Sequence, residues 1–307
     1  FGMSHGTRHP PKPEKRRKAA EAVHAASRLP APLVYEVIRR DGQEELERPW
    51  ASLVWSGLAA GILISFSVLG EALLRTHLPD ASWRPLVENL GYSFGFLLVI
   101  LGRMQLFTEN TITTVLPLCT GDFRDSIGRV MKLWLTVLTA NIAGALVAAA
   151  FIAHAGAIDA GVVQAVEDLA LHMAGYSPWE SFLRGIPAGI LIAAIVWMLP
   201  SAGGSAFWII LLFTYLIALG EFTHVIAGSV EVLYLMITGL ADLQHGVTGF
   251  LVPVFLGNVI GGTAVFTLLA WGQVRREVPQ DGGFMNDPDR AGRQDDREAR
   301  LRSDDSP

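Results

Sequence analysis

The sequence predicts an all-helical integral membrane protein whose six transmembrane helices form two inverted repeats of three. A long apolar body lies between two charged ends, six apolar segments divide that body, and similar motifs recur in both of its halves. Charged residues make up 17% of the 307 residues, below the ~25% usual for soluble chains, and AVILMFWYC reach 51%. Cys119 is the single cysteine. This composition argues against a soluble enzyme and against a disulfide-rich secreted domain.

Six segments are apolar enough to cross a membrane, which takes about 20 mostly apolar residues each. Buried helices of a large soluble protein are the alternative, but six such segments in one chain favour the membrane. The second and the fifth are interrupted by polar residues. In order, the segments are 51–74, 86–119, 127–154, 181–199, 206–240 and 247–273.

Basic residues predict the orientation, because they concentrate on the cytoplasmic side of membrane proteins. They cluster in the N-terminal tail, after the second segment and after the sixth, and six crossings bring all three regions to one side. We therefore expect both termini in the cytoplasm, in a multi-pass protein whose expected location is the bacterial inner membrane; the basic residues bear on the orientation alone. The residues are Lys12, Lys15, Arg16, Arg17, Lys18, Arg124, Arg129, Lys132, Arg275 and Arg276.

The regions outside the six segments are polar and charged, which predicts disordered cytoplasmic tails over 1–32 and 275–307. Between the first tail and the membrane, apolar residues recur at helical spacing from Leu33 to Ile38. This pattern predicts an amphipathic juxtamembrane helix over 33–49, with a solvated linker as the alternative. The channel domain would then occupy 50–274.

An internal repeat relates the first three segments to the last three. Because three crossings is an odd number, the two copies must enter the membrane in opposite directions, an arrangement typical of transporters. In the first pair below, six of nine positions are identical. The matching pairs are Gly57–Ser65 with Gly185–Ala193, Leu101-Gly102 with Leu219-Gly220, and Asn141–Gly144 with Asn258–Gly261.

The interruptions of segments two and five predict a site. A charge near the bilayer centre costs several kcal/mol, and irregular backbone is tolerated there only where it is buried or lines a cavity. Broken helices at matching repeat positions therefore indicate a permeation path. The polar residues and glycines are Gly102, Arg103, Gln105, Thr108, Glu109 and Asn110 in segment two, and Gly220, Glu221, Thr223, His224, Gly228, Ser229 and Glu231 in segment five.

The repeat places Arg103 and Glu221 at equivalent positions, each directly after the glycine of its break. We expect these opposite charges to pair and to hold the two breaks together, since an unpaired charge would be costly there.

Four motifs resemble the formate/nitrite transporter family. That family has six spans in an inverted 3+3 repeat with helices two and five broken, in an aquaporin-like manner, and forms homopentamers with one pore per protomer. The resemblance covers about 50–275. The motifs are Leu106-Phe107-Thr108, Phe222-Thr223-His224 with Ala227, Pro253–Gly262, and Trp134 with Asn141 and Gly144.

The resemblance implies a channel for small monovalent anions such as formate, nitrite or hydrosulfide, with protons as a second partner. Thr108 would approach a central pore histidine, His224, and Leu106 and Phe107 would form an apolar constriction. Phe222 and Thr223 belong to the same motif as the histidine. No enzymatic activity, cofactor, metal or nucleic acid is expected.

Several residues depart from the family pattern. Thr223, Val225 and Gly228 stand where glutamate, serine and asparagine are usual, and Gly189 stands in the region of a polar asparagine. Asn141, Asn258, Gly189 and Gly228 are instead expected to support helix packing. The added charges are Arg103, Glu109, Glu221 and Glu231.

Acidic groups in a pore repel anions and can favour cations. The alternative function is therefore a pore for a cation or a small neutral solute. Glu109 and Glu231 could face this pore, a central five-fold hole or packed helices. A non-conducting membrane scaffold with charged tails is a third hypothesis.

Overall fold

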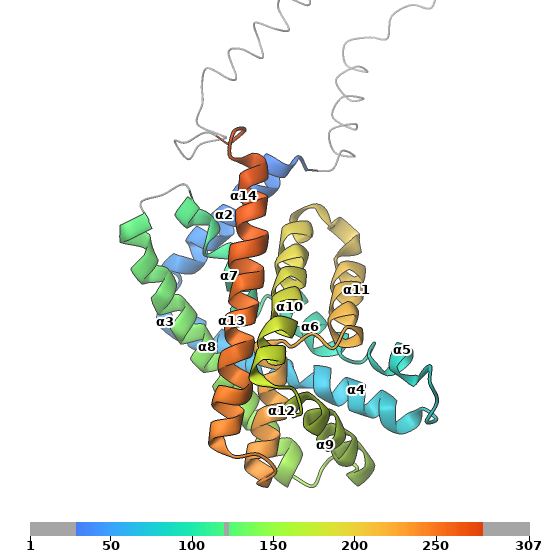
Figure 1. The fold of residues 1–307 in the computed structure, drawn as a ribbon. Coiled ribbons are helices and arrows are strands. Elements are labelled where there is room, and N and C mark those ends of the chain that lie inside the picture. Colours follow the sequence, from blue (N-terminus) through green and yellow to red (C-terminus); the bar gives the residue numbers. More distant parts are fainter. Residues whose placement is uncertain (1–28, 120–122, 279–307) are drawn as a thin grey trace, which may run out of the picture. The chain divides into compact units, whose positions relative to one another are not determined.

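The computed structural model describes residues 29–119 and 123–278 (Figure 1), and these residues form helices and no strand. The predicted disorder of both tails lies outside the described residues, except at their inner edges. The all-helical fold class is confirmed. Within the part of the chain that the structure describes, four helices are long and apolar enough to cross a membrane, and they are Trp50–His77, Ser126–His154, Pro178–Ser201 and His245–Val274.

The first repeat begins with α3 and α4, which together make one long helix. The second predicted segment divides into α6 and α7, and α8 follows as the third. The bounds are α3 (Trp50–Leu63), α4 (Ser65–His77), α5 (Arg84–Glu88), α6 (Ser93–Leu101), α7 (Phe107–Thr113), the 3₁₀ turn η1 (Leu116–Cys119) and α8 (Phe123–His154).

The second repeat follows the same plan after a separate helix, α9. Its fifth segment divides into α11 and α12, and its last helix contains two π-helical stretches, η4 and η5. The bounds are α9 (Ala160–Ala174), α10 (Pro178–Met198), η2 (Leu199–Ser201), η3 (Gly203–Ser205), α11 (Ala206–Leu219), α12 (Val225–Thr238), η4 (His245–Leu251), α13 (Val252–Val259), η5 (Ile260–Thr267) and α14 (Leu268–Val274).

Both breaks have the same backbone. Arg103 and Glu221, each with φ of 51°, are the described non-glycine residues in the left-handed region, a conformation that costs such residues about 1 kcal/mol or more. In the first break the amide of Met104 donates to Val99, and in the second that of Phe222 donates to Ile217. The two halves of the chain therefore end their helices in the same way.

One buried asparagine from α8 serves the first break. Asn141 donates from Nδ2 to the carbonyls of Gly57 and Gln105, both at 2.8 Å. Its Oδ1 accepts from the amide of Phe107 at 2.9 Å. Backbone groups that a broken helix frees inside a membrane need such partners, so Asn141 closes the gap between α6 and α7.

The second break has the equivalent clamp. Asn258 donates to the carbonyls of Gly185 at 2.8 Å and Thr223 at 2.9 Å. Its Oδ1 accepts from the amide of Val225 at 2.8 Å. All three partners correspond to those of Asn141, so the hydrogen-bond pattern reproduces the repeat that the sequence predicts.

Close helix contacts surround both predicted packing glycines. A Cβ on Gly189 would collide with the backbone of Asn258, so this glycine lets α10 approach α13. A Cβ on Gly228 would collide with the ring of Phe250, which packs α12 against η4. Both positions favour glycine for its lack of a side chain.

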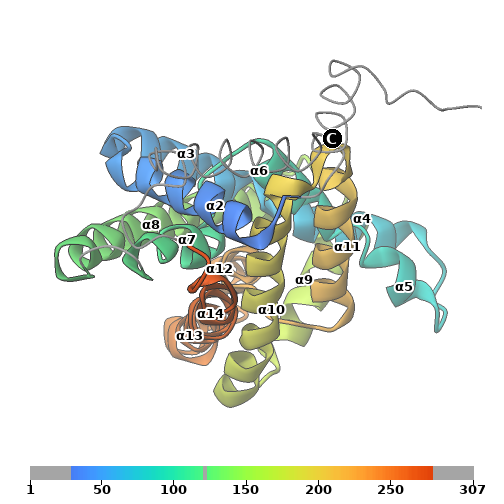
Figure 2. The same cartoon turned by 90° about the horizontal axis from the view of Figure 1, so that it is seen from above.

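The helix α2 (Ala31–Glu47) occupies the predicted amphipathic stretch. It packs against the bundle, over α7 and beside α10 (Figure 2), rather than lying free on a surface. Tyr35 is fully buried and donates from its hydroxyl to the carbonyl of Leu116 at 3.2 Å. Gly42 lies directly against the carbonyl of Thr113, so α2 is anchored next to the first break.

Glu36 on α2 provides a test of this docking. It is buried and binds Arg39 at 2.8 Å and Arg40 at 2.7 Å. Burial raises the pKa of Glu36, but the two arginines outweigh this effect and hold the pKa below its ordinary value of 4.5. The carboxylate therefore stabilises α2 above about pH 4.5, and this contribution disappears as the pH falls through the lower folded pKa.

We expect Glu36→Gln to weaken α2 docking at pH 7 by about 2 kcal/mol, because it removes charge-assisted hydrogen bonds from a buried arginine. Hydrogen exchange of α2 measures the effect, and its acid sensitivity should disappear in the variant. Glu45→Gln, which removes the more exposed pair with Arg48, is the control and should change docking by less than about 1 kcal/mol. Equal protection of α2 in Glu36→Gln and the unmodified protein would contradict the prediction.

Candidate functional site

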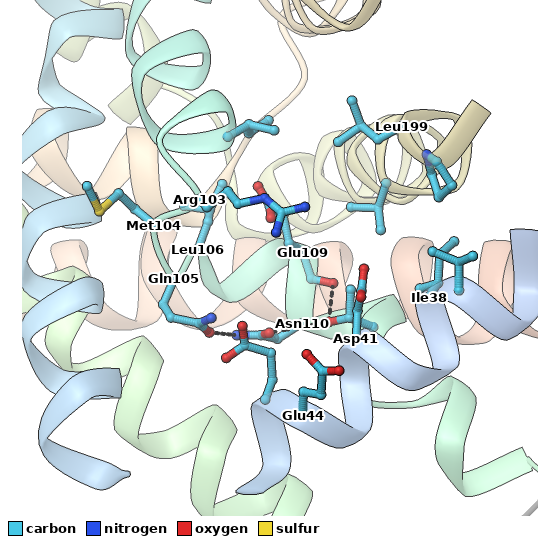
Figure 3. Close-up of a pocket in the computed structure, with 16 residues that line it drawn as sticks. Ile38, Asp41, Glu44, Arg103, Met104, Gln105, Leu106, Glu109, Asn110 and Leu199 are labelled. Atoms are coloured by element: carbon cyan, nitrogen blue, oxygen red, sulfur yellow. Dashed lines mark hydrogen bonds between the residues drawn. The ribbon is translucent and has the colours of Figure 1, made fainter. Parts of the chain in front are cut away.

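A cavity of about 290 Å³ opens on the α2 side of the first break (Figure 3) and is called here the Arg103 pocket. The break of segment two, α2 and the end of α10 line it. Arg103 and Glu109 point into it, opposite Asp41 and Glu44 of α2. Leu106, 1% exposed, lies at its inner end beside the N-terminus of α7.

A second cavity of about 90 Å³ lies beside the second break and is called here the Glu231 pocket. Glu71 of α4 and Glu231 of α12 both line it. His224, the N-cap residue of α12, also lines it. Since Leu106 and His224 cap the two half-helices, the two pockets approach the breaks from equivalent positions of the repeat.

The two breaks meet at a contact between Thr108 and His224. Thr108 Oγ1 lies 2.8 Å from His224 Nε2, and each residue is 1% exposed. His224 Nδ1 accepts from the amide of Ala227 at 3.3 Å. A neutral imidazole has one proton, so this acceptor role assigns the proton to Nε2, which then donates to Thr108. The ring of Phe96 packs edge-on against the His224 ring, with 4.9 Å between the two ring centroids.

The other predicted pore residues, including the two of the apolar constriction, Leu106 and Phe107, do not all lie together. Leu106 lines the Arg103 pocket, and Phe222 and Thr223 line the Glu231 pocket. Phe107 lines neither pocket. Its fully buried ring packs on Trp134 and Phe255. The structure thus brings Phe107 into the helix packing behind the break.

The predicted pairing of Arg103 with Glu221 is wrong. Glu221 Oε2 binds Arg184 Nη1 at 3.2 Å and accepts from the hydroxyl of Tyr176 at 2.7 Å, and His172 lies 3.6 Å from Oε1. Arg103 instead lines the opposite pocket. An inverted repeat relates equivalent residues through a rotation that exchanges the two faces, so the two charges lie at different mouths.

The sequence prediction missed several residues that line the pockets. His172 belongs to α9 and Tyr176 follows it, and the sequence prediction does not include this helix. Asp159 caps its N-terminus, where Oδ1 accepts from the amide of Gly161 at 2.8 Å. That capping residue before an apolar, helically spaced run was an available signal. Glu71 was overlooked inside an otherwise apolar segment, where a lone carboxyl group itself indicates a cavity. Asp41 and the other α2 residues of the Arg103 pocket could not be identified without knowing how α2 docks.

Comparisons with known proteins point to one family. The family model described as formate/nitrite transporter matches residues 32–272. The inner membrane protein YfdC of Escherichia coli is 38% identical over 267 residues, covering 86% of each chain. The formate channel FocA of Haemophilus influenzae is 28% identical over 243 residues, covering 70% of this chain and 84% of that protein.

Solved structures show the same fold. An FNT family ion channel matches with a TM-score of 0.66 and 21% identity over 79% of this chain and 98% of that one. A pentameric formate channel with formate bound matches with a TM-score of 0.62 and 22% identity over 74% of this chain and 98% of the other. With its broken helices, paired asparagine clamps and family match over most of its length, the chain belongs to the formate/nitrite transporter family.

Proposed function

We propose that this protein is a channel for small monovalent anions of weak acids, of the formate, nitrite and hydrosulfide class. The path in each protomer runs from the Arg103 pocket past the Thr108–His224 contact to the Glu231 pocket. The buried contact that joins the two breaks, 2.8 Å between Thr108 Oγ1 and His224 Nε2, is the observation that carries this proposal. The names of similar proteins support an inner-membrane channel that assembles as a pentamer. Both termini would lie in the cytoplasm.

The chemistry follows from what each side chain offers. Nε2 supplies the polar hydrogen in a region that Phe96 and Leu106 make apolar. An anion that leaves water there loses its hydration and gains only one hydrogen bond. Anions of strong acids, which stay charged, are therefore disfavoured. The anion of a weak acid can take up a proton from the aqueous side and cross the apolar segment as the neutral acid. The pore would therefore select permeating molecules by their acidity and not by their size alone.

A second candidate is a pore for a cation or a small neutral solute. Carboxyl groups line both mouths, and their excess over basic groups supports this alternative. Arg103 is the one basic side chain among the described residues that line its pocket. The carboxyl groups are Asp41, Glu44, Glu45 and Glu109 in the Arg103 pocket, and Glu71, Glu221 and Glu231 in the Glu231 pocket.

Reversal potentials in proteoliposomes under a salt gradient distinguish the candidates. The first candidate predicts an anion-selective current and formate flux that Glu231→Gln increases. A carboxylate about 8 Å from the anion in a partly hydrated pocket costs on the order of 1 kcal/mol, or about fivefold in rate. Asp168→Asn, on the exposed side of α9, is the control and should leave flux unchanged.

Other outcomes select the alternatives. A cation-selective current that Glu231→Gln abolishes would support the second candidate and contradict the first. Flux of neutral solutes without current would do the same. A protein that assembles but passes no solute would instead support a non-conducting scaffold.

A further inference from the structure

The half-helix α7 ends inside the protein, where its last carbonyls need hydrogen-bond donors. The amide and hydroxyl of Thr114 serve the carbonyl of Asn110, and side chains from other helices supply further bonds. Trp134 of α8 donates to the carbonyl of Asn110 at 3.3 Å. Thr263 of η5 donates from Oγ1 to the carbonyl of Thr111 at 2.7 Å. The C-terminus of α7 is thus bonded to the last helix of the second repeat.

Two further bonds connect this end of α7 to the pore contact. Thr111 donates from Oγ1 to the carbonyl of Thr108 at 2.7 Å. Thr108 Oγ1 in turn meets His224 Nε2 at 2.8 Å. Thr108, Thr111 and His224 are at most 1% exposed, so water cannot replace these bonds. If α7 shifts where Thr263 holds it, the hydroxyl of Thr108, which faces His224, therefore moves with it.

The local backbone suits this contact. Thr263 lies in the π-helical stretch η5, and such irregular turns often occur at functional sites. Its neighbour Gly262 has no side chain, and a Cβ there would collide with Oγ1 of Thr111. The last helix is therefore shaped to approach α7 closely at this point.

The equivalent half-helix has no such anchor. In the alignment of Asn141 with Asn258, the residue that corresponds to Thr263 is Leu146, which is 45% exposed and has no donor. The other half-helix, α12, ends instead in a glycine cap at Gly239, with φ of 79°. The fold thus forms without a hydroxyl at this position, and the anchor is particular to the half-helix that carries Thr108.

We propose that Thr263 is a positioning residue of the pore, which holds α7 so that Thr108 Oγ1 stays within hydrogen-bond reach of His224 Nε2. It acts through Thr111 and touches no permeating molecule. This inference rests on the proposed function, because it assigns a task at the same Thr108–His224 contact. Loss of the Thr263 hydroxyl should therefore resemble loss of the Thr108 hydroxyl.

Formate flux into proteoliposomes between pH 5 and pH 8 tests the inference. Thr263→Val keeps the shape of the side chain and removes the donor. We expect flux to fall about tenfold, the equivalent of one lost hydrogen bond, with the same altered pH profile as Thr108→Val. Thr263→Ser should restore both flux and profile. Thr248→Val is the control and should match the unmodified protein, because Thr248 is exposed and bonds only within its own helix.

The double variant Thr108→Val with Thr263→Val should be no worse than Thr108→Val alone, since both changes break one chain of contacts. If Thr263→Val fails to assemble, Thr111→Val breaks the next bond and carries the same expectation. Additive losses, or equal losses in Thr263→Val and Thr263→Ser with an unaltered pH profile, would overturn the inference in favour of plain packing.

Two results separate the inference from the proposed function. Normal flux in Thr263→Val, with losses in Thr108→Val and His224→Ala, would overturn the inference and leave the proposed function standing. Normal flux in His224→Ala and in Thr108→Val would overturn the proposed function, and the inference with it.

Discussion

Replacing His224 with alanine is expected to reduce formate flux on the order of a hundredfold. The change deletes the polar hydrogen between the two breaks and leaves Thr108 Oγ1 facing an apolar gap. The anion would then enter the buried segment without a hydrogen bond, at a cost of about 3 kcal/mol, which corresponds to roughly that factor. Stopped-flow uptake of formate into proteoliposomes measures it.

The matched control is His154→Ala, because His154 is an exposed histidine at the end of α8. Flux through that variant should stay within about twofold of the unmodified protein, as expected for surface changes. Undiminished formate uptake in His224→Ala, at normal assembly, would contradict a pore at this histidine.

Replacing Asn258 with leucine is expected to prevent stable folding. The change leaves the carbonyls of Gly185 and Thr223 and the amide of Val225 buried without this partner. Gly185 lies inside α10 and keeps its helical partner, but the carbonyl of Thr223 and the amide of Val225 lie in the break and lose theirs. Each such group costs about 1–3 kcal/mol, so the sum of about 2–6 kcal/mol approaches the whole stability of a marginally stable domain. The yield of assembled protein in detergent and its melting temperature measure the effect.

Asn141→Leu should be as damaging, since the first break has the same three bonds. Gln164→Leu, on the exposed side of α9, is the control and should assemble normally. A normal yield and melting temperature for Asn258→Leu would show that other donors serve the break.

The breaks could be predicted from sequence because they depart from the apolar pattern of a membrane-spanning helix. Polar residues and glycines interrupt runs that are otherwise apolar, and Asn141 and Asn258 recur at matching positions of the repeat. Irregular backbone in a membrane needs side-chain partners, and these residue types supply them. For that reason the helix ends at Gly102 and Gly220 were within reach of the sequence pattern, whereas the meeting of Thr108 with His224 was implied by the resemblance to the family.

The charges at the mouths could not be placed in the same way. The partners of Glu221 come from α9 and α10, and the carboxyl groups opposite Arg103 come from α2. Which face of α2 meets the bundle depends on contacts far apart in sequence, such as Tyr35 with Leu116. Sequence periodicity shows that a helix is amphipathic, and does not show what covers it.

One nitrogen of the His224 ring is turned into its own helix, where Nδ1 accepts from the amide of Ala227. A proton wire needs a ring that receives on one nitrogen and releases from the other. Here Nδ1 is occupied by the backbone amide, so the ring can exchange its proton through Nε2 alone and cannot relay protons from one mouth to the other. A membrane that holds an electrochemical gradient could therefore accommodate this pore without being discharged through its central histidine.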